Sequence, residues 1–199
     1  MTSATPSDAR EVIRRLEAGG YQPILVGGLA VEVAGYGGTK DVDVLLPEAQ
    51  YGGAEFLHTS GVTVFSNTGN FTNGTLTLRA GRVIPFDILN PALFVGEGHT
   101  GEEFFRFVEA HGSRKTRYGR VASPAVVYYT RLLVAGSHGR RYELRIRRDL
   151  DEGAPPSWLE KALVIARRFG TEKRVRRRVE QIRKERVPRS EAKDLGQGR

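Results

Sequence analysis

The sequence predicts an α/β (α+β) fold, with a mixed sheet flanked by helices and followed by a C-terminal helical region. Apolar segments of strand length alternate with helical patterns as far as residue 120, and helical patterns take over after Ser123. The length of 199 residues suits one domain with a small helical appendage. We therefore expect one domain over 1–120, a helical region over 121–187 and a disordered basic tail over 188–199.

Each expected element of the first part follows from hydrophobic periodicity and from the residues that cap or break it. Ser7 is expected to cap the first helix, and Gly19-Gly20 to end it. Gly27-Gly28 separates the first strand from a short helix. In order, we expect a helix over 8–18, a strand over 22–26, a short helix over 29–34, a strand over 41–46, a helical turn near 54–58, a strand over 62–65, and a hairpin of 75–79 with 82–89.

Pro85 lies in the second strand of this hairpin and has no amide hydrogen to donate to a neighbouring strand. We therefore expect that strand at a sheet edge or with a bulge.

The rest of the chain is first hard to assign and then helical. Residues 90–120 show no clear pattern. Ser123-Pro124 is an N-cap followed by a proline at the first helical position. Helices are then expected over 124–135 and 141–150, over 158–169 with Ser157 as cap, and from the cap Thr171 through Arg186.

Composition excludes several kinds of site. The chain has no cysteine, which excludes disulfides and thiolate metal sites. Its four histidines include no pair at i,i+4, which argues against a histidine zinc site. No apolar run approaches the roughly 18 residues of a membrane helix, and the first residues lack a secretory pattern. We therefore expect a cytoplasmic protein without membrane contact, and its oligomeric state is left open.

The positive charge is concentrated at one end of the chain. Residues 161–199 hold 14 of the 31 basic residues and 5 of the 23 acidic ones, so the whole surplus of positive charge lies there. Such an extension favours a polyanionic partner, most simply RNA, while a solvated tail is the alternative. Almost no aromatic residues accompany these charges, which suits phosphate contact. The candidate RNA or phosphate contacts are Arg147, Arg148, Arg174, Arg177 and Arg178.

Two carboxylates on one strand form the first candidate site. Asp41 and Asp43 are two residues apart on a strand, so both side chains point to the same face. Side chains at that spacing can converge on Mg²⁺, which prefers oxygen ligands. The alternative is an edge strand with one polar face. A second Asp-x-Asp, at 149–151, falls at an expected helix end, where capping or a salt bridge explains it.

Two further features add to this site. Gly27-Gly28 opens a helix, whose N-terminal amides can bind an anion and whose glycines allow close approach, although a tight turn is the alternative. Asp87 interrupts an apolar strand and needs a cation or hydrogen-bond donors. It joins the site if its strand neighbours 41–46. Its alternative is a salt bridge to Arg79 or Arg82 across the hairpin.

Together these motifs resemble the DNA polymerase β-like nucleotidyltransferase superfamily. The resemblance rests on Val26-Gly27-Gly28, then twelve residues, then Asp41-Val42-Asp43, and Asp87 on a later strand. The stretch 38–43 looks most like small toxin-type (abortive-infection) and antibiotic-modifying members, although Gly37 stands where those relatives often have arginine. Glu32-Val33 stands where CCA-adding enzymes have Arg-Asp, which speaks against CCA addition. Residues 147–149 are similar to a basic-acidic pair in a later helix of toxin-type relatives.

This resemblance implies a function, a cofactor and partners. A nucleoside monophosphate would pass from an NTP such as ATP to an acceptor hydroxyl, possible acceptors being RNA, tRNA, a protein or a small molecule, with release of pyrophosphate. Asp41 and Asp43 would bind two Mg²⁺ (or Mn²⁺) ions, and Asp87 would bind one of them and help to deprotonate the acceptor. An antitoxin partner protein is also implied. The residues implied at the nucleotide phosphates are Gly27, Gly28, Thr39 and Lys40, of which Lys40 has simple solvation as its alternative.

Two other functions fit part of the pattern. A glycosyltransferase also uses Asp-x-Asp to bind a metal and a nucleotide diphosphate, but it explains neither Gly27-Gly28 nor Asp87. A non-catalytic RNA-binding module would use only the basic C-terminal helices. Nucleotide incorporation separates the transferase from both.

Overall fold

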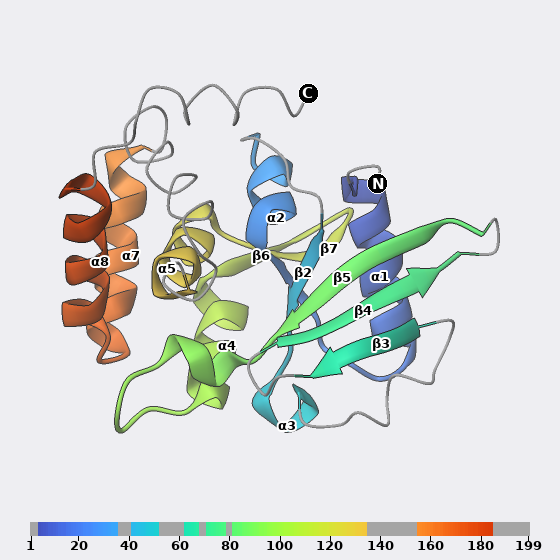
Figure 1. Ribbon diagram of the computed structural model, residues 1–199, viewed down its shortest axis with the longest axis horizontal. Helices are drawn as coiled ribbons and strands as arrows, with labels where there is room; N and C mark the ends of the chain where they lie inside the picture. Colours follow the sequence, from blue (N-terminus) through green and yellow to red (C-terminus); the bar gives the residue numbers. More distant parts are fainter. Residues whose placement is uncertain are drawn as a thin grey trace.

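The computed structural model describes residues 4–35, 41–51, 62–67, 71–78, 81–134 and 155–184 (Figure 1). Over these residues it contains a seven-stranded sheet in the order β3-β4-β5-β2-β1-β7-β6. The strands are β1 Ile24–Val26, β2 Val42–Leu45, β3 Val62–Asn67, β4 Phe71–Thr77, β5 Val83–Leu89, β6 Ser113–Thr116 and β7 Gly119–Ala122. The helices are α1 Pro6–Ala18, α2 Gly27–Val33, α3 Glu48–Tyr51, the 3₁₀ helix η2 Pro91–Phe94, α4 Gly101–His111, α5 Pro124–Val134, α7 Pro156–Arg168 and α8 Glu172–Lys184.

The sheet is mixed, as the sequence predicted, and it is flanked by helices. β2 pairs with β5 in parallel and with β1 antiparallel, and β1 pairs with β7 in parallel. The β3–β4, β4–β5 and β6–β7 pairs are antiparallel. The predicted fold class is therefore confirmed, and β2, with the Asp-x-Asp motif at its start, lies near the middle of the sheet.

The expectation that β5 lies at an edge or carries a bulge was wrong. β5 is an interior strand between β4 and β2 (Figure 1). Pro85 pairs with Thr75 of β4, whereas the recorded pairing with β2 begins one residue later, at Phe86 and Val42. The missing amide of proline is therefore tolerated, because β5 is not yet paired with β2 at that position.

The first helix begins two residues earlier than expected. Thr5, not Ser7, is its N-cap, and Thr5 and Asp8 form the reciprocal capping box. Asp8 is buried and also accepts from the guanidinium of Arg82, 2.7 Å away on the β4–β5 hairpin. The carboxylate of Asp8 thus fixes the start of α1 and ties it to the sheet.

The unassigned stretch 90–120 contains regular structure. α4 starts at a capping box formed by Thr100 and Glu103. The β6–β7 hairpin follows, and β7 adds to the sheet beside β1, with Val121 next to Leu25. β6 is short and polar, so hydrophobic alternation could not reveal it.

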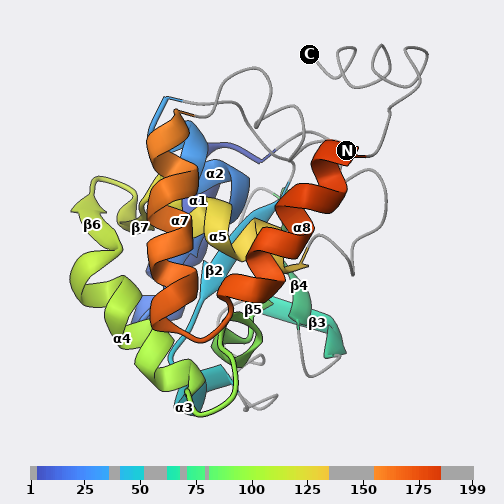
Figure 2. The ribbon, with the colours of Figure 1, turned by 90° about the vertical axis from the view of Figure 1, so that its left-hand side faces the viewer.

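The C-terminal helices pack against one another and against the sheet domain. α5 contacts α2, α7 and α8, and Figure 2 shows α7 and α8 lying in front of α5. Phe104 of α4 meets Tyr129 of α5 and Phe169 at the end of α7, with ring centroids 5.7 and 5.3 Å apart. One buried core therefore runs from the sheet into the helical part.

The caps of these helices agree only in part with expectation. Ser123 accepts from the amide of Val126, as predicted for the N-cap of α5. α7 begins at Pro156 after Pro155, without the predicted Ser157 cap. The hydroxyl of Thr171 hydrogen-bonds to the buried hydroxyl of Tyr129, 2.9 Å away, so it links α8 to α5.

Three expected segments fall outside the described residues: the turn near 54–58, the helix over 141–150 and the tail over 188–199. Across the part of the chain that is described, no helix combines the length and the apolar character needed to cross a membrane.

Candidate active site

The turn from β1 into α2 places two glycines against an aspartate of the neighbouring strand. Gly27 has φ +65°, and a Cβ atom built on it would collide with the carboxylate of Asp43. The amide of Gly28 donates a hydrogen bond to the same carboxylate. Glycine is therefore required at position 27 both by the left-handed backbone and by the contact with Asp43.

Substituting Gly27 with alanine is expected to destabilise the protein by roughly 2–4 kcal/mol, from backbone strain and from displacement of the Asp43 carboxylate. Gly20→Ala is the matched control, because Gly20 has φ +85° with nothing within 4 Å of its added Cβ. That variant should show backbone strain alone, about 1–2 kcal/mol. Urea unfolding of the two variants measures the difference, and equal losses would show that Asp43 does not fill the space over Gly27.

The carboxylate of Asp87 lies beside that of Asp43. Asp43 and Asp87 are direct partners in the parallel β2–β5 pair, so their side chains point to the same face of the sheet. Val26 lies opposite Asp43 on β1, and Asn73 lies opposite Asp87 on β4. The side-chain amide of Asn73 donates to Oδ1 of Asp87 at 2.6 Å. A polar row thus crosses the sheet at the end of β1, next to the start of α2.

The carboxylates repel one another. Burial, and then the charges of Asp87 and Asp41, raise the pKa of Asp43 to about 7 from its ordinary value of 3.8. The guanidinium of Arg131 and the amide of Gly28 act in the opposite direction. All three predicted acids are therefore close enough to interact electrostatically, and protonation or a cation would relieve the repulsion.

Arg131 is a site residue that the sequence analysis missed. It lies on α5, it is buried, and its charge lowers the pKa of Asp43. Among the residues of α5, from Pro124 to Val134, it is the one charged side chain. A buried charge needs a partner, so a lone arginine in an apolar helix was the available signal.

Asp87 accepts a hydrogen bond from the side-chain amide of Asn73. The sequence left open a salt bridge to Arg79 or Arg82 as the alternative. Arg82 forms its ion pair with Asp8, and Arg79 lies outside the described residues. The hydrogen bond from Asn73 holds one oxygen of Asp87. The hairpin salt bridge to Arg82 is therefore replaced by an amide–carboxylate contact across β4 and β5.

Several predicted site residues are not described or lie elsewhere. Thr39, Lys40, Arg147 and Arg148 fall outside the described residues. On α8, Arg174 donates to the carbonyl oxygen of Leu133 at 3.1 Å. The other two predicted contacts there are the exposed Arg177 and the partly buried Arg178.

The three carboxylates of Asp41, Asp43 and Asp87 fit a hard divalent cation. Over the described ranges, no three acidic, histidine or cysteine side chains form a metal site by themselves. Mg²⁺ does not need one, because one or two carboxylates, substrate phosphates and water commonly complete its shell. Asp43, with Asp41 and Asp87 close by, supplies oxygen donors whose repulsion a cation would relieve. These residues therefore fit Mg²⁺ whose remaining ligands come from water or a bound anion.

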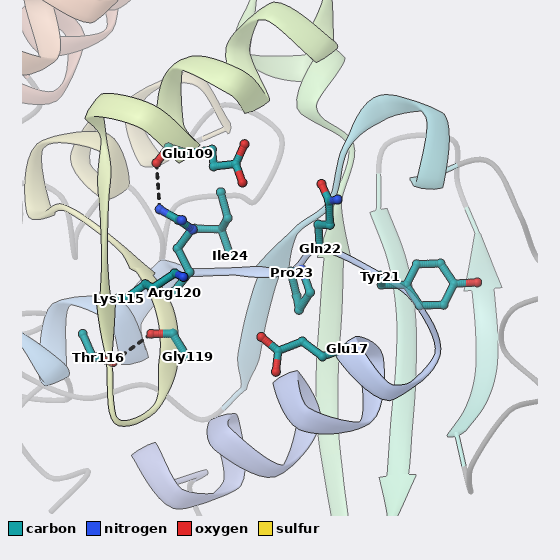
Figure 3. Close-up of a pocket in the computed structure, with 10 residues that line it drawn as sticks. All are labelled: Glu17, Tyr21, Gln22, Pro23, Ile24, Glu109, Lys115, Thr116, Gly119 and Arg120. Atoms are coloured by element: carbon teal, nitrogen blue, oxygen red, sulfur yellow. Dashed lines mark hydrogen bonds between the residues drawn. The ribbon is translucent and has the colours of Figure 1, made fainter.

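A separate hollow of about 470 Å³ lies where the ends of α1 and α4 meet the β6–β7 hairpin (Figure 3). In it, Arg120 donates to the carbonyl oxygen of Glu109 at 2.8 Å. Glu17 and Lys115 also line it, so the two signs of charge balance. It contains none of the predicted functional residues and is not part of the candidate active site.

Comparison with known proteins gives structural likeness alone. No family model and no curated protein matches the sequence. A solved protein described as a "putative nucleotidyltransferase from H. pylori" matches with a TM-score of 0.43 and 10% sequence identity, over 91% of this chain and 96% of that chain. A likeness this distant says nothing about activity.

Proposed function

We propose that the protein is a Mg²⁺-dependent nucleotidyltransferase that moves a nucleoside monophosphate from an NTP to an acceptor hydroxyl. The observation that carries the proposal is the in-register pair of Asp43 and Asp87, with Asp41 close by and the Gly27-Gly28 turn against Asp43. Crowded carboxylates of this kind lower stability unless a ligand uses them. Such a site supports metal-assisted phosphoryl-type transfer.

Each residue has a role in this reaction. Asp41 and Asp43 bind the metal ions, which when bound neutralise the charge of the triphosphate. Asp87, oriented by Asn73, takes the proton of the acceptor hydroxyl. The hydroxyl oxygen forms a bond to the α-phosphorus, the bond from that phosphorus to the β-phosphate bridge breaks, and pyrophosphate leaves.

The glycine turn and Arg131 support the phosphates. The amide of Gly28 donates a hydrogen bond to Asp43 in the described structure. If Asp43 holds a metal ion, the amides of Gly27 and Gly28 at the start of α2 would be the donors for the triphosphate. Arg131 balances the carboxylates when no nucleotide is bound. Thr39 and Lys40 are proposed as further phosphate contacts from the family resemblance.

The direct test is nucleotide transfer. Wild-type protein with Mg²⁺, each labelled NTP in turn and cellular RNA or protein is expected to attach label to an acceptor. EDTA, or the double substitution Asp41→Ala/Asp43→Ala, should abolish labelling, whereas Asp8→Asn, which changes a buried carboxylate away from the site, should keep it. Mass spectrometry of the product identifies the acceptor. Equal labelling by wild type and the double variant, or none with any acceptor, would count against the proposal.

RNA or tRNA is the acceptor class that the charge distribution favours. α8 buries Val175, Val179 and Ile182 and exposes most of its basic residues, including Arg177. Its outer face therefore suits a phosphate backbone. The toxin-type resemblance adds an antitoxin-like partner protein to the proposal. UDP-sugars in the same assay test the glycosyltransferase alternative, since sugar transfer without nucleotide transfer would favour it.

A further inference from the structure

A hollow outside the carboxylate site has aromatic walls. It lies between α4 and the end of α7, and its volume is about 460 Å³. Figure 2 shows these two helices on the side that faces the viewer. Phe107 of α4 and Phe169 after α7 meet edge to face there, with ring centroids 5.4 Å apart. The volume falls within the range of about 300–1,000 Å³ typical of small-ligand sites.

Arg168 forms a stacking platform in this hollow. Its guanidinium carbon lies 4.9 Å from the ring centroid of Phe107 and 5.9 Å from that of Phe169. Arg168 is exposed, whereas Phe169 is buried and Phe107 is partly buried. Because a guanidinium is planar, one face can stack on Phe107 while the other receives a second flat group. An aromatic ring system is the ligand group that suits an exposed guanidinium.

The charge around the platform favours an anionic ligand. Arg106, Arg168 and the two histidines His99 and His111 line the hollow, with Glu103 as the acidic residue among the lining side chains. Nδ1 of His99 lies 3.6 Å from the Glu103 carboxylate, and Arg106 forms an ion pair with Glu102 at 2.9 Å. The positive charge that the hollow offers to a ligand therefore comes chiefly from Arg168. A flat aromatic group carrying negative charge is the chemistry of a nucleotide, and single-stranded RNA presents it repeatedly.

We propose that this hollow binds an unpaired base of an RNA strand, with the base stacked on Arg168 and the adjoining phosphate near Arg106 or His111. The inference rests on the proposed function in making RNA the acceptor class. The sequence showed arginines almost without aromatic neighbours, whereas the fold brings Phe107 from α4 to the end of α7.

Binding can be measured without metal or NTP. We compare a fluorescent oligoadenylate with an abasic strand of equal length and charge, using fluorescence anisotropy. The wild type is expected to bind the strand with bases about tenfold more tightly. Arg168→Ala and Arg168→Lys should both lose this preference, because lysine keeps the charge but lacks the planar group. Arg177→Ala, which removes an exposed charge on α8, should keep it.

Salt dependence separates charge from stacking in the same variants. Arg168→Ala and Arg177→Ala should each reduce the size of the salt slope by about 0.7, the value for one charge on a single strand, whereas Arg168→Lys should leave the slope unchanged. Retention of the base preference in Arg168→Lys, its loss in Arg177→Ala, or equal binding of both strands by the wild type would overturn the inference. Transfer assays run in parallel distinguish the two proposals. If the protein transfers nucleotides but shows no preference for the strand with bases, only the inference about the hollow is wrong. If it shows that preference but transfers no nucleotide, only the proposed function is wrong.

Discussion

Asp43→Asn is expected to lower nucleotide transfer by roughly 10³-fold and, at the same time, to stabilise the metal-free protein at pH 8. The transfer loss follows because the amide cannot neutralise a cation. The gain in stability follows because asparagine keeps an oxygen for the amide of Gly28 but removes the charge that burial, Asp87 and Asp41 disfavour. An activity loss coupled to a stability gain is characteristic of a strained functional site.

The pH dependence of this gain has a defined sign. The pKa of Asp43 is raised from 3.8 to about 7, so the folded state holds this proton more tightly than the unfolded chain. The stability that comes from this bound proton of Asp43 is fully present below about pH 4 and is lost as the pH rises through about 7. At pH 8 the penalty in the wild type is about 2–4 kcal/mol, allowing for solvent that reaches the carboxylate.

Thermal unfolding at several pH values measures this effect. The Tm of Asp43→Asn should exceed that of the wild type by roughly 4–16 °C at pH 8, and the difference should shrink toward pH 4. Asp8→Asn is the matched control with the opposite sign, since it weakens the partly buried ion pair with Arg82. If Asp43→Asn were no more stable than the wild type at pH 8, the carboxylates would not be crowded.

Much of the candidate site was predictable because its signals are local. An apolar strand, a glycine pair and an Asp-x-Asp strand follow one another within residues 22–46, and each has its own composition. Asp87 stood out because it interrupts an apolar strand. Asp87 joins the site only if its strand neighbours 41–46, and the parallel pairing of β5 with β2 places it there.

The other features depended on long-range packing. Asn73 reaches Asp87 only through the register of β4 with β5, and Arg131 reaches Asp43 only because α5 packs beside α2. β7 lies beside β1 although more than ninety residues separate them in the chain. The expectation drawn from Pro85 was wrong because proline disfavours an interior strand only where its amide would be paired. The pairing of β5 with β2 begins one residue after Pro85. No periodicity within one segment encodes such neighbours.

Arg131→Met is expected to destabilise the protein by roughly 3–5 kcal/mol at pH 8. Arg131 is buried and lowers the pKa of Asp43, so its removal leaves Asp41, Asp43 and Asp87 with less compensating charge. Methionine fills similar space, which limits the loss from packing. Arg174→Ala is a control, because Arg174 is exposed and donates to a backbone carbonyl, so its loss should cost about 1 kcal/mol.

A second substitution shows whether the loss is electrostatic. If Arg131 acts by balancing the carboxylates, Arg131→Met/Asp43→Asn should be more stable than Arg131→Met alone, because the double variant lacks the charge that Arg131 offsets. Added Mg²⁺ should likewise stabilise Arg131→Met more than it stabilises the wild type, because less of the charge of the carboxylates is then offset by α5. Urea unfolding at pH 8, with and without Mg²⁺, gives both comparisons. Losses that simply add in the double variant would mean that Arg131 supports α5 by packing and has no part in the charge balance of the site.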